Sequence, residues 1–244
     1  MGRMQPDRRH ALYSLGSFVT LGVLGCSSTA SPTSATTGGT ESTSSTNSSC
    51  VVTPALTEGP YFVDERLNRS DIRIDPASGA LSGGVPLGLA LKLSQVSASG
   101  ACTPLGGALV DVWHCDASGL YSDVSSNNTV GRKFLRGYQV SDAGGLVQFS
   151  TIYPGWYQGR AVHIHFKVRT NPSGTSGLEF TSQLFFDESL TDVVHAQAPY
   201  STRGRRDTLN SRDGIYSGGG TQLVIPLSAS GGGYAGTLSA SVRA

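Results

Sequence analysis

The sequence predicts an all-β fold, an antiparallel β-sandwich, for the domain that spans residues 50–244. Short stretches in which apolar and polar residues alternate recur along this part of the chain, and clusters of Gly, Ser, Pro and Asn separate them. Such alternation is typical of strands that bury one face, and frequent turn residues favour short connected strands. The third observation is a high glycine content, 32 of 244 residues, together with only 14% charged residues.

The alternating stretches define the expected strands in order. Leu87, Leu89, Leu91 and Leu93 give the clearest pattern. Further stretches alternate in the same way: 107–113, 146–151, 162–168, 180–186 and 221–227. The long segment 187–220 has no such pattern and is expected to be an irregular loop, since loops of this length are either functional or simply solvated.

The first 25 residues have the composition of a secretory signal peptide. Arg8 and Arg9 precede a mostly apolar stretch, 11–25, that is too short to span a bilayer. The stretch ends in Val-Leu-Gly-Cys, which resembles the lipobox of bacterial lipoproteins and implies a lipid on Cys26; an ordinary signal peptide cleaved slightly later is the alternative. The arginine pair also fits twin-arginine export. We expect an exported protein, either a cell-surface lipoprotein or a secreted one, whose membrane contact is confined to that lipid.

Residues 26–49 are expected to form a flexible tether. They are almost wholly Ser, Thr, Gly, Asn, Ala and Pro, with the single charge Glu41. Such a segment cannot bury enough apolar surface to offset the entropy of ordering it.

The cysteines suit an oxidising compartment. If Cys26 carries a lipid, Cys50, Cys102 and Cys115 remain. A bridge between Cys50 and Cys102 would staple the start of the domain, but Cys115 competes for either partner. No C-x-x-C spacing indicates a structural zinc site.

Charge excludes one class of partner. The chain has 18 Lys and Arg against 17 Asp and Glu, a net charge of +1. Proteins that bind nucleic acid usually carry a basic excess. No nucleic-acid partner is therefore expected, and the charge balance leaves the oligomeric state open.

The sharpest local signal is the segment 161–169, AVHIHFKVR. On a strand, successive side chains point to opposite faces, so His163 and His165 share one face while the apolar residues between and around them share the other. Two imidazoles about 7 Å apart at Cα can converge on one ion, since the strand rises roughly 3.3 Å per residue. Imidazole suits Zn, Cu, Fe and Ni alike. Alone, this pattern is more typical of two surface histidines on a half-exposed strand than of a metal site.

Three other segments contain aromatic and polar residues that could form a site with the two histidines. TIYPGWYQGR, 151–160, leads into the histidine strand, and VDVWHCDASGLYSD, 110–123, is a strand followed by a turn that ends in tyrosine. TEGPYF, 57–62, lies near the start of the domain. These blocks, in this order, resemble the intradiol ring-cleavage dioxygenases, the family of the catechol and protocatechuate dioxygenases.

The resemblance implies a β-sandwich that holds one non-haem ferric ion, Fe(III), through two tyrosinates and two histidines. Carried over onto this sequence, the ligands are Tyr121, Tyr157, His163 and His165. The implied reaction cleaves a catecholic ring with O2, between its two hydroxyl-bearing carbons, to a cis,cis-muconate-type diacid. Phenolates are hard anionic donors that favour ferric iron, and tyrosinate ligation of iron is also known from catalase.

The resemblance also implies further roles. Tyr157 is the base that accepts a substrate proton, Arg160 stabilises charge on the ring, and Gln183 lies near both as a supporting side chain. Thr57, Gly59, Pro60 and Tyr61 match a segment that lines the substrate mouth. His114 and His195 match no such position and are expected to be structural or surface residues.

The sequence departs from the family pattern in one loop. Only five residues separate Tyr157 from His163, where members that cleave aromatic acids carry a longer loop with a tryptophan over the ring. The shorter loop predicts a more open site, in which Trp156 is a possible substitute. Arg203, Arg205 and Arg206 are candidate partners for a substrate carboxylate.

Two alternatives compete with this interpretation. A cupin-like barrel also uses H-x-H, but it needs a Glu soon after the second His, and here the next one is Glu179. The other is a metal-free binding module, a sandwich tethered at the cell surface. The intact set of two tyrosines and two histidines favours the enzyme, because a binding module has no need for it.

Overall fold

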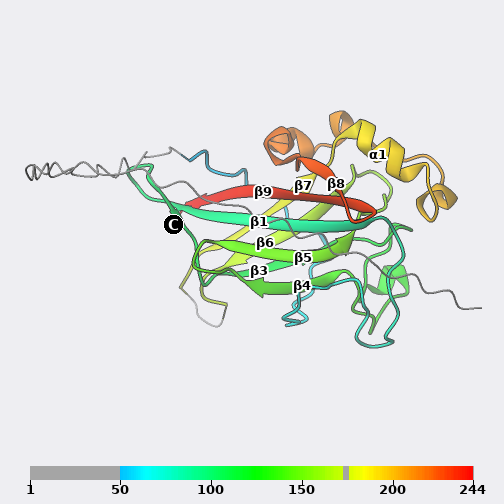
Figure 1. Ribbon diagram of the computed structural model, residues 1–244, viewed down its shortest axis with the longest axis horizontal. Coiled ribbons are helices and arrows are strands. Elements are labelled where there is room, and N and C mark those ends of the chain that lie inside the picture. Colours follow the sequence, from blue (N-terminus) through cyan, green and yellow to red (C-terminus); the bar gives the residue numbers. More distant parts are fainter. Residues whose placement is uncertain (1–49, 173–175, 244) are drawn as a thin grey trace, which may run out of the picture. The chain divides into compact units, whose positions relative to one another are not determined.

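The computed structural model describes residues 50–172 and 176–243. The predicted signal peptide, 1–25, and the predicted tether, 26–49, lie outside the described residues. Two β-sheets stack on each other (Figure 1), which confirms the all-β sandwich. The first sheet contains β1 (Pro86–Val96), β2 (Cys102–Pro104), β5 (Leu146–Ile152), β8 (Leu227–Ser230) and β9 (Gly233–Arg243). The second contains β3 (Leu109–Trp113), β4 (Arg136–Val140), β6 (His163–Arg169) and β7 (Glu179–Phe185).

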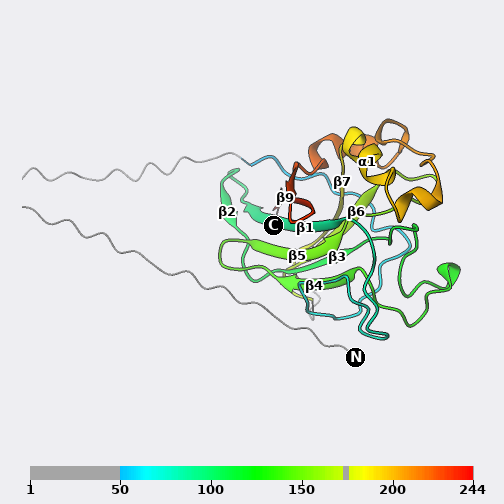
Figure 2. The ribbon, with the colours of Figure 1, turned by 45° about the vertical axis from the view of Figure 1, so that its right-hand side comes forward.

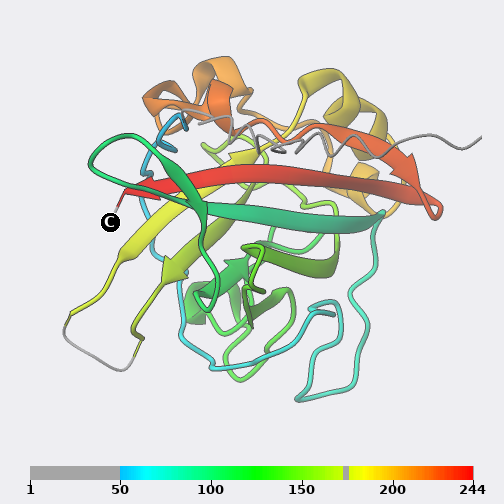
Figure 3. The ribbon, with the colours of Figure 1, turned by 60° about the vertical axis from the view of Figure 1, so that its left-hand side comes forward.

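Strand pairing is antiparallel with one exception. The second sheet has the order β4-β3-β6-β7 and pairs antiparallel throughout. In the first sheet β1 pairs antiparallel with β2 and β5 but parallel with β9. The two long strands β1 and β9 lie side by side in Figure 3. Strand β9 thus returns across the domain to pair with β1 and lies between β1 and β8 in the sheet.

The inner faces of the two sheets form one apolar core. Leu87, Leu89, Leu91 and Leu93 of β1 are all buried, as the alternation predicts. They face the apolar side chains of the second sheet, including Ile164 of β6. Burying each such side chain stabilises the fold by about 1.5–3 kcal/mol.

The prediction of an irregular loop over 187–220 is wrong. The segment contains the helix α1 (Glu188–His195), and Figure 2 shows α1 and β2 on opposite sides of the domain. Asp187 caps the helix, because its side chain accepts a hydrogen bond from the Leu190 backbone N–H at 2.9 Å. Short 3-10 turns follow: Tyr200–Arg203, Asn210–Arg212, Tyr216–Gly218 and Gly220–Leu223. The last of these also overturns the strand expected over 221–227, of which only Leu227 belongs to β8.

Among the described residues, no helix combines the length and the apolarity that crossing a membrane requires.

The segment 53–66 runs over the outer face of the second sheet. Its contacts with this sheet begin at Pro54, whose carbonyl accepts a hydrogen bond from Ser182 Oγ at 2.7 Å. The backbone N–H of Leu56 donates to Thr181 O at 3.0 Å. We call residues 53–66 the strap. Because the strap covers one face and the core covers the other, every residue of β6 is buried.

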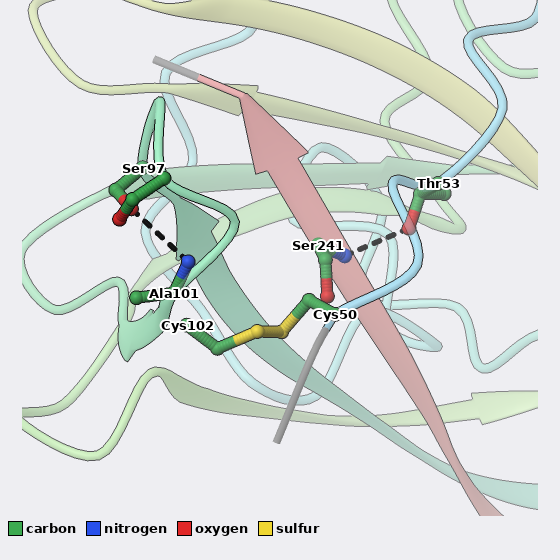
Figure 4. Close-up of a disulfide and its surroundings, with 7 residues drawn as sticks. Cys50, Thr53, Ser97, Ala101, Cys102 and Ser241 are labelled. Atoms are coloured by element: carbon green, nitrogen blue, oxygen red, sulfur yellow. Dashed lines mark hydrogen bonds between the residues drawn. A yellow bond between two sulfur atoms is a disulfide. The ribbon is translucent and has the colours of Figure 1, made fainter. Parts of the chain in front are cut away.

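A disulfide ties the chain just before the strap. Cys50 and Cys102 are bonded, with Cα atoms 5.8 Å apart, while Cys115 is a buried free thiol. Beside the bridge, Ser241 N of β9 donates a hydrogen bond to Thr53 Oγ1 at 2.7 Å (Figure 4). The backbone N–H of Thr53 donates in return to Ser241 O at 2.8 Å. The bridge therefore fixes the end of the strap to the edge of the first sheet.

Removing this bridge should destabilise the domain. Closing a loop of 52 residues restricts the unfolded chain by about 4 kcal/mol in the chain-entropy model. For the Cys50→Ser, Cys102→Ser variant we expect a melting temperature lower by about 10 °C, since each kcal/mol shifts a domain of this size by about 2–4 °C. Reductant should lower the melting temperature of the wild type to that of the variant and leave the variant unchanged. Equal melting temperatures of wild type and variant would contradict the pairing.

Candidate active site

His163 and His165 occupy the face of β6 that points away from the core. They are 2% and 1% exposed, so the alternative of two surface histidines on a half-exposed strand does not hold: the strap covers this face. Gly59 of the strap lies directly over the second imidazole, since a Cβ at this position would sit 3.5 Å from His165 Cε1. The pair is therefore an internal feature of the domain rather than two surface residues.

Two turns bring Tyr121 and Tyr157 to the same place. Tyr121 follows β3 through a turn in which Asp116 Oδ1 accepts hydrogen bonds from two backbone N–H groups, at 2.8 and 2.9 Å. Tyr157 ends the segment that follows β5. The turns pack together through Gly119 and Gly155, where a Cβ would come within 2.2 Å of Trp156 O and 2.5 Å of Asp116 O respectively. Only glycine allows this approach, which sets the separation of the two phenols.

Four donor atoms converge at this point. His163 Nε2 lies 3.0 Å from His165 Nε2, 3.4 Å from Tyr121 Oη and 3.3 Å from Tyr157 Oη. Ligand atoms bound to one ion at about 2.0–2.1 Å stand about 2.8–3.4 Å apart at right-angled or tetrahedral geometry. The observed spacings match those of a single coordination sphere, so the residues present fit a metal ion with two phenolate and two imidazole ligands.

The ring orientations suit this role. His163 Nδ1 lies 2.6 Å from Ala161 O, so Nδ1 carries the proton and Nε2 keeps its lone pair toward the cluster. The His165 ring stacks on Trp113, with centroids 4.8 Å apart and planes 7° from parallel. Its Nδ1 is buried with no hydrogen-bond partner among the described residues. Stacking rather than hydrogen bonding therefore holds this second imidazole.

Burial keeps all four groups neutral in the protein alone. It lowers the pKa of His163 to about 3, with a smaller contribution from Arg160, and holds the pKa of His165 well below its usual range. Burial also raises the pKa of Tyr157 to about 12 and that of Tyr121 well above 10. The imidazoles are ready to bind a cation without losing a proton, whereas each phenol must lose one.

Arg160 connects the cluster to its surroundings. Its Nη1 lies 3.4 Å from Tyr157 Oη and 3.5 Å from His163 Nε2. Its Nη2 donates to Gln183 Oε1 at 2.5 Å, and Gln183 Nε2 donates to Thr57 O at 2.7 Å. Gln183 is fully buried, so the outward-facing alternative for this residue does not hold.

The strap residues named from the sequence lie around the tyrosines. Tyr61 stacks on Tyr121 with centroids 4.5 Å apart and meets Tyr157 edge-on at 6.0 Å. Thr57 Oγ1 accepts a hydrogen bond from Gly59 N at 3.2 Å, which shapes the turn before the exposed Pro60. The structure thus brings all the sequence-predicted site residues to one region.

The sequence of this chain matches a known protein family. A family model described as Dioxygenase matches residues 57–209, more than half of the chain. The chain belongs to the intradiol ring-cleavage dioxygenase family. The matched range includes the four donor residues, the strap from Thr57 onward and the two tyrosine turns.

Curated relatives cover only part of this family member. A chlorocatechol 1,2-dioxygenase of Pseudomonas putida is 33% identical over 117 residues, which is 39% of this chain and 42% of that protein. A catechol 1,2-dioxygenase of Candida albicans is 31% identical over 104 residues, 40% of this chain and 34% of that protein. The similarity therefore spans less than half the length of these relatives.

Two solved structures are similar to this chain over a larger share of its length than the curated relatives are. An intradiol ring-cleavage dioxygenase from Tetranychus urticae is 31% identical with a TM-score of 0.69, covering 80% of this chain and 95% of that one. The dioxygenase domain of a carbohydrate-binding fusion protein from Streptomyces sp. SirexAA-E is 27% identical with a TM-score of 0.57, covering 79% and 99%. This likeness extends over nearly the whole of both solved chains.

Sequence reasoning missed three residues that shape the site. Trp113 supports His165, as described above. Arg136 of β4 donates through Nη1 to Tyr61 O at 3.1 Å and so holds the strap. Asp213 pairs with Arg160. The tryptophan could have been found from its register opposite His165, but the other two come from segments with no recognisable pattern.

The remaining candidates lie elsewhere. Trp156 Nε1 donates to Gly204 O at 3.3 Å, and Arg203 stacks over its ring at 4.7 Å, so this indole is engaged with the segment after α1. Arg206 is ion-paired with Glu188 and Asp192. His114 is buried and bonded to Thr151 Oγ1 at 2.6 Å, and His195 faces Pro154 O at 3.0 Å, which confirms structural roles for both.

Within the described ranges, no group of three or more His, Cys, Asp or Glu side chains is placed to hold a metal ion.

Proposed function

We propose that this protein is a non-haem Fe(III) dioxygenase that cleaves a catecholic ring with O2, between the hydroxyl-bearing carbons, to a cis,cis-muconate-type diacid. The observation that carries the proposal is the convergence of two phenol oxygens and one imidazole nitrogen on a second imidazole nitrogen, His163 Nε2, at 3.0–3.4 Å. Family membership supports the same reaction.

The donor set favours ferric iron over other metals. Two hard phenolates and two neutral imidazoles offset much of the charge of a trivalent ion and leave room for an anionic substrate. When bound, the ferric ion supplies a Lewis acid for the two catechol oxygens and an electron acceptor that makes the ring reactive toward O2.

The chain's own residues handle binding, orientation and protons. The Tyr157 phenolate oxygen receives a proton from a substrate hydroxyl, and Arg160 Nη1, 3.4 Å away, stabilises the charge that then develops on the ring. Gln183 holds the guanidinium in this orientation. Tyr61 and Gly59 form the wall of the site, where a flat aromatic ring packs against the tyrosine stack.

Export is part of the proposal. The Cys50–Cys102 bridge supports folding in an oxidising compartment, as does the signal-like start of the sequence. We propose that the reaction takes place outside the cytoplasm, with or without a lipid on Cys26.

The direct test is turnover by the purified, iron-loaded full chain. With catechol and oxygen, we expect one O2 consumed per ring and the ultraviolet absorption of a conjugated diacid. Zinc loading should give an inactive protein, because zinc has no redox chemistry. If iron-loaded protein consumes no O2 with catechol, chlorocatechol or hydroxyquinol, the proposed reaction is refuted in favour of a binding module.

Iron affinity should rise with pH. The imidazoles are already neutral above pH 5, whereas both phenols are protonated near neutrality, so uptake of ferric iron releases two protons. Between about pH 5 and 9 the apparent affinity is expected to increase about 100-fold per pH unit, one factor of ten for each proton. Competition against a chelator of known proton stoichiometry measures this slope. A pH-independent affinity would mean that the phenols are not ligands.

A further inference from the structure

The carboxylate of Asp213 lies beneath Arg160, beyond the range 57–209 that the family model matches. Its Oδ2 accepts hydrogen bonds from Arg160 Nε at 2.9 Å and from the Ala161 backbone N–H at 2.8 Å. Its Oδ1 accepts from the backbone N–H groups of Ile215 at 2.7 Å and Tyr216 at 3.2 Å. The side chain is 1% exposed, so this carboxylate is buried and fully hydrogen-bonded.

Each nitrogen of the Arg160 guanidinium has its own hydrogen-bond partner. Nε is held by Asp213 and Nη2 by Gln183, which leaves Nη1 pointing at Tyr157 Oη and His163 Nε2. A planar guanidinium that is fixed at two nitrogens cannot rotate its third. Asp213 therefore sets the direction in which Arg160 donates.

The same carboxylate shapes the short loop that carries Tyr157. The Ala161 N–H that it accepts lies between Arg160 and the start of β6, and the Gly159 N–H points at the carboxylate of Asp207, with its two oxygens at 3.2 and 3.3 Å. Both aspartates belong to the segment after α1. Only five residues lie between Tyr157 and His163. The hydrogen bonds from the loop backbone to these two carboxylates hold this short loop in place.

We propose that Asp213 is a positioning residue for ring cleavage, which aims Arg160 at the Tyr157 oxygen and at the charge developing on the substrate. This inference rests on the proposed function. It assigns a role to the segment after α1, which clamps the catalytic loop, and it predicts that the reaction depends on a residue that touches neither substrate nor metal.

Asp213→Asn is the informative substitution. An amide has one carbonyl oxygen, so its NH2 group must face either the Arg160 and Ala161 donors or the Ile215 and Tyr216 donors. We expect kcat to fall about 10- to 100-fold with the anaerobic Kd for catechol changed less than about threefold, because misalignment of Arg160 removes an interaction made in the transition state. Asp213→Ala is less suitable, since it leaves a buried arginine without its counter-charge and endangers folding.

Asp111→Asn is the matched control. Asp111 Oδ2 accepts from Arg169 Nε at 3.1 Å and Nη2 at 2.7 Å, a second largely buried Asp–Arg pair, located at the other end of β6. Its loss should lower the melting temperature and leave kcat within about twofold, because the pair has no contact with the donor cluster. Equal kcat values for Asp213→Asn and wild type would reduce Asp213 to a structural ion pair and overturn the proposal.

A double-variant cycle identifies the route of the effect. If Asp213 acts through Arg160, then Asp213→Asn should lower kcat less than about twofold further in the Arg160→Lys background. Losses that multiply would show that Asp213 acts independently of Arg160 and would contradict the proposal.

One readout does not need activity. In the metal-free full chain, the Arg160 Nε–H proton should exchange slowly with water, and Asp213→Asn should accelerate this exchange at least about tenfold while Asp111→Asn leaves it unchanged. If the wild type turns over no catechol but shows this protection, the proposed function fails and the positioning geometry stands. If the Arg160 proton exchanges equally fast in wild type and Asp213→Asn, the positioning role is refuted whatever the activity.

Discussion

Replacing Tyr157 by Phe should lower turnover of catechol by the iron-loaded chain at least about 100-fold, the lower range of what a positioned general base contributes. The phenol oxygen of Tyr157 is both a proposed ligand and the proposed proton acceptor, and it lies 3.3 Å from His163 Nε2 and 3.4 Å from Arg160 Nη1. Phe keeps the ring that meets Tyr61 edge-on and removes only the oxygen. Initial rates of O2 consumption and the visible spectrum measure the two consequences separately.

Tyr153→Phe is the control for this substitution. Tyr153 is fully buried, and its hydroxyl exchanges a hydrogen bond with Thr191 Oγ1 at 2.7 Å, away from the donor cluster. Losing that bond should cost about 1 kcal/mol of stability and leave the rate and colour unchanged. If Tyr157→Phe kept wild-type turnover, the phenol would have no part in the reaction.

Replacing Arg160 by Lys should lower kcat about 10²- to 10³-fold, the loss typical of removing one preorganised donor to a developing anion. Lysine keeps the positive charge beside Asp213 but has no second nitrogen for Gln183 and no fork to direct toward Tyr157. Because the interaction matters most in the transition state, the anaerobic affinity for catechol should change little. Steady-state kinetics and anaerobic titration separate the two effects.

Gln183→Leu is a useful companion to Arg160→Lys. It removes the acceptor at Nη2 and the donor to Thr57 O but leaves the charge of Arg160 in place. A smaller fall in kcat than in Arg160→Lys is expected. Should Arg160→Lys leave kcat within about threefold of wild type, its charge alone would suffice, contrary to a role for a directed donor.

The sequence predicted the core strands where apolar alternation is strong. The leucines of β1 and the apolar residues of β6 mark their strands within one to three positions. The sequence pattern did not predict β9. Its inward face includes the small Ala240 between Leu238 and Val242, and the residues around them are Gly, Ser and Thr, so the apolar alternation is weak. The sequence pattern did not predict β4 either, because its first residue is the buried Arg136. Hydrogen bonds from Arg136 to the strap and to Ser122 offset the cost of burying its charge.

The site was predictable from local motifs but its support was not. H-I-H and the two turns that end in tyrosine are short, contiguous and chemically distinctive. The burial of His163 and His165 depends on the strap, which starts about 100 residues earlier, and no pattern in β6 reveals that cover. Likewise Asp213 reaches Arg160 only through the fold of the segment after α1, and the sequence predicts no regular structure in α1 or in that segment.

The most direct test of the central claim is the metal content and visible spectrum of the full chain loaded with ferric iron. The account predicts one iron per chain and a reddish tyrosinate-to-iron charge-transfer band that shifts in Tyr121→Phe and Tyr157→Phe, disappears with the iron in His165→Ala, and stays unchanged in Tyr153→Phe. Protein that binds no iron, or a spectrum that is the same in all of these variants, would contradict it.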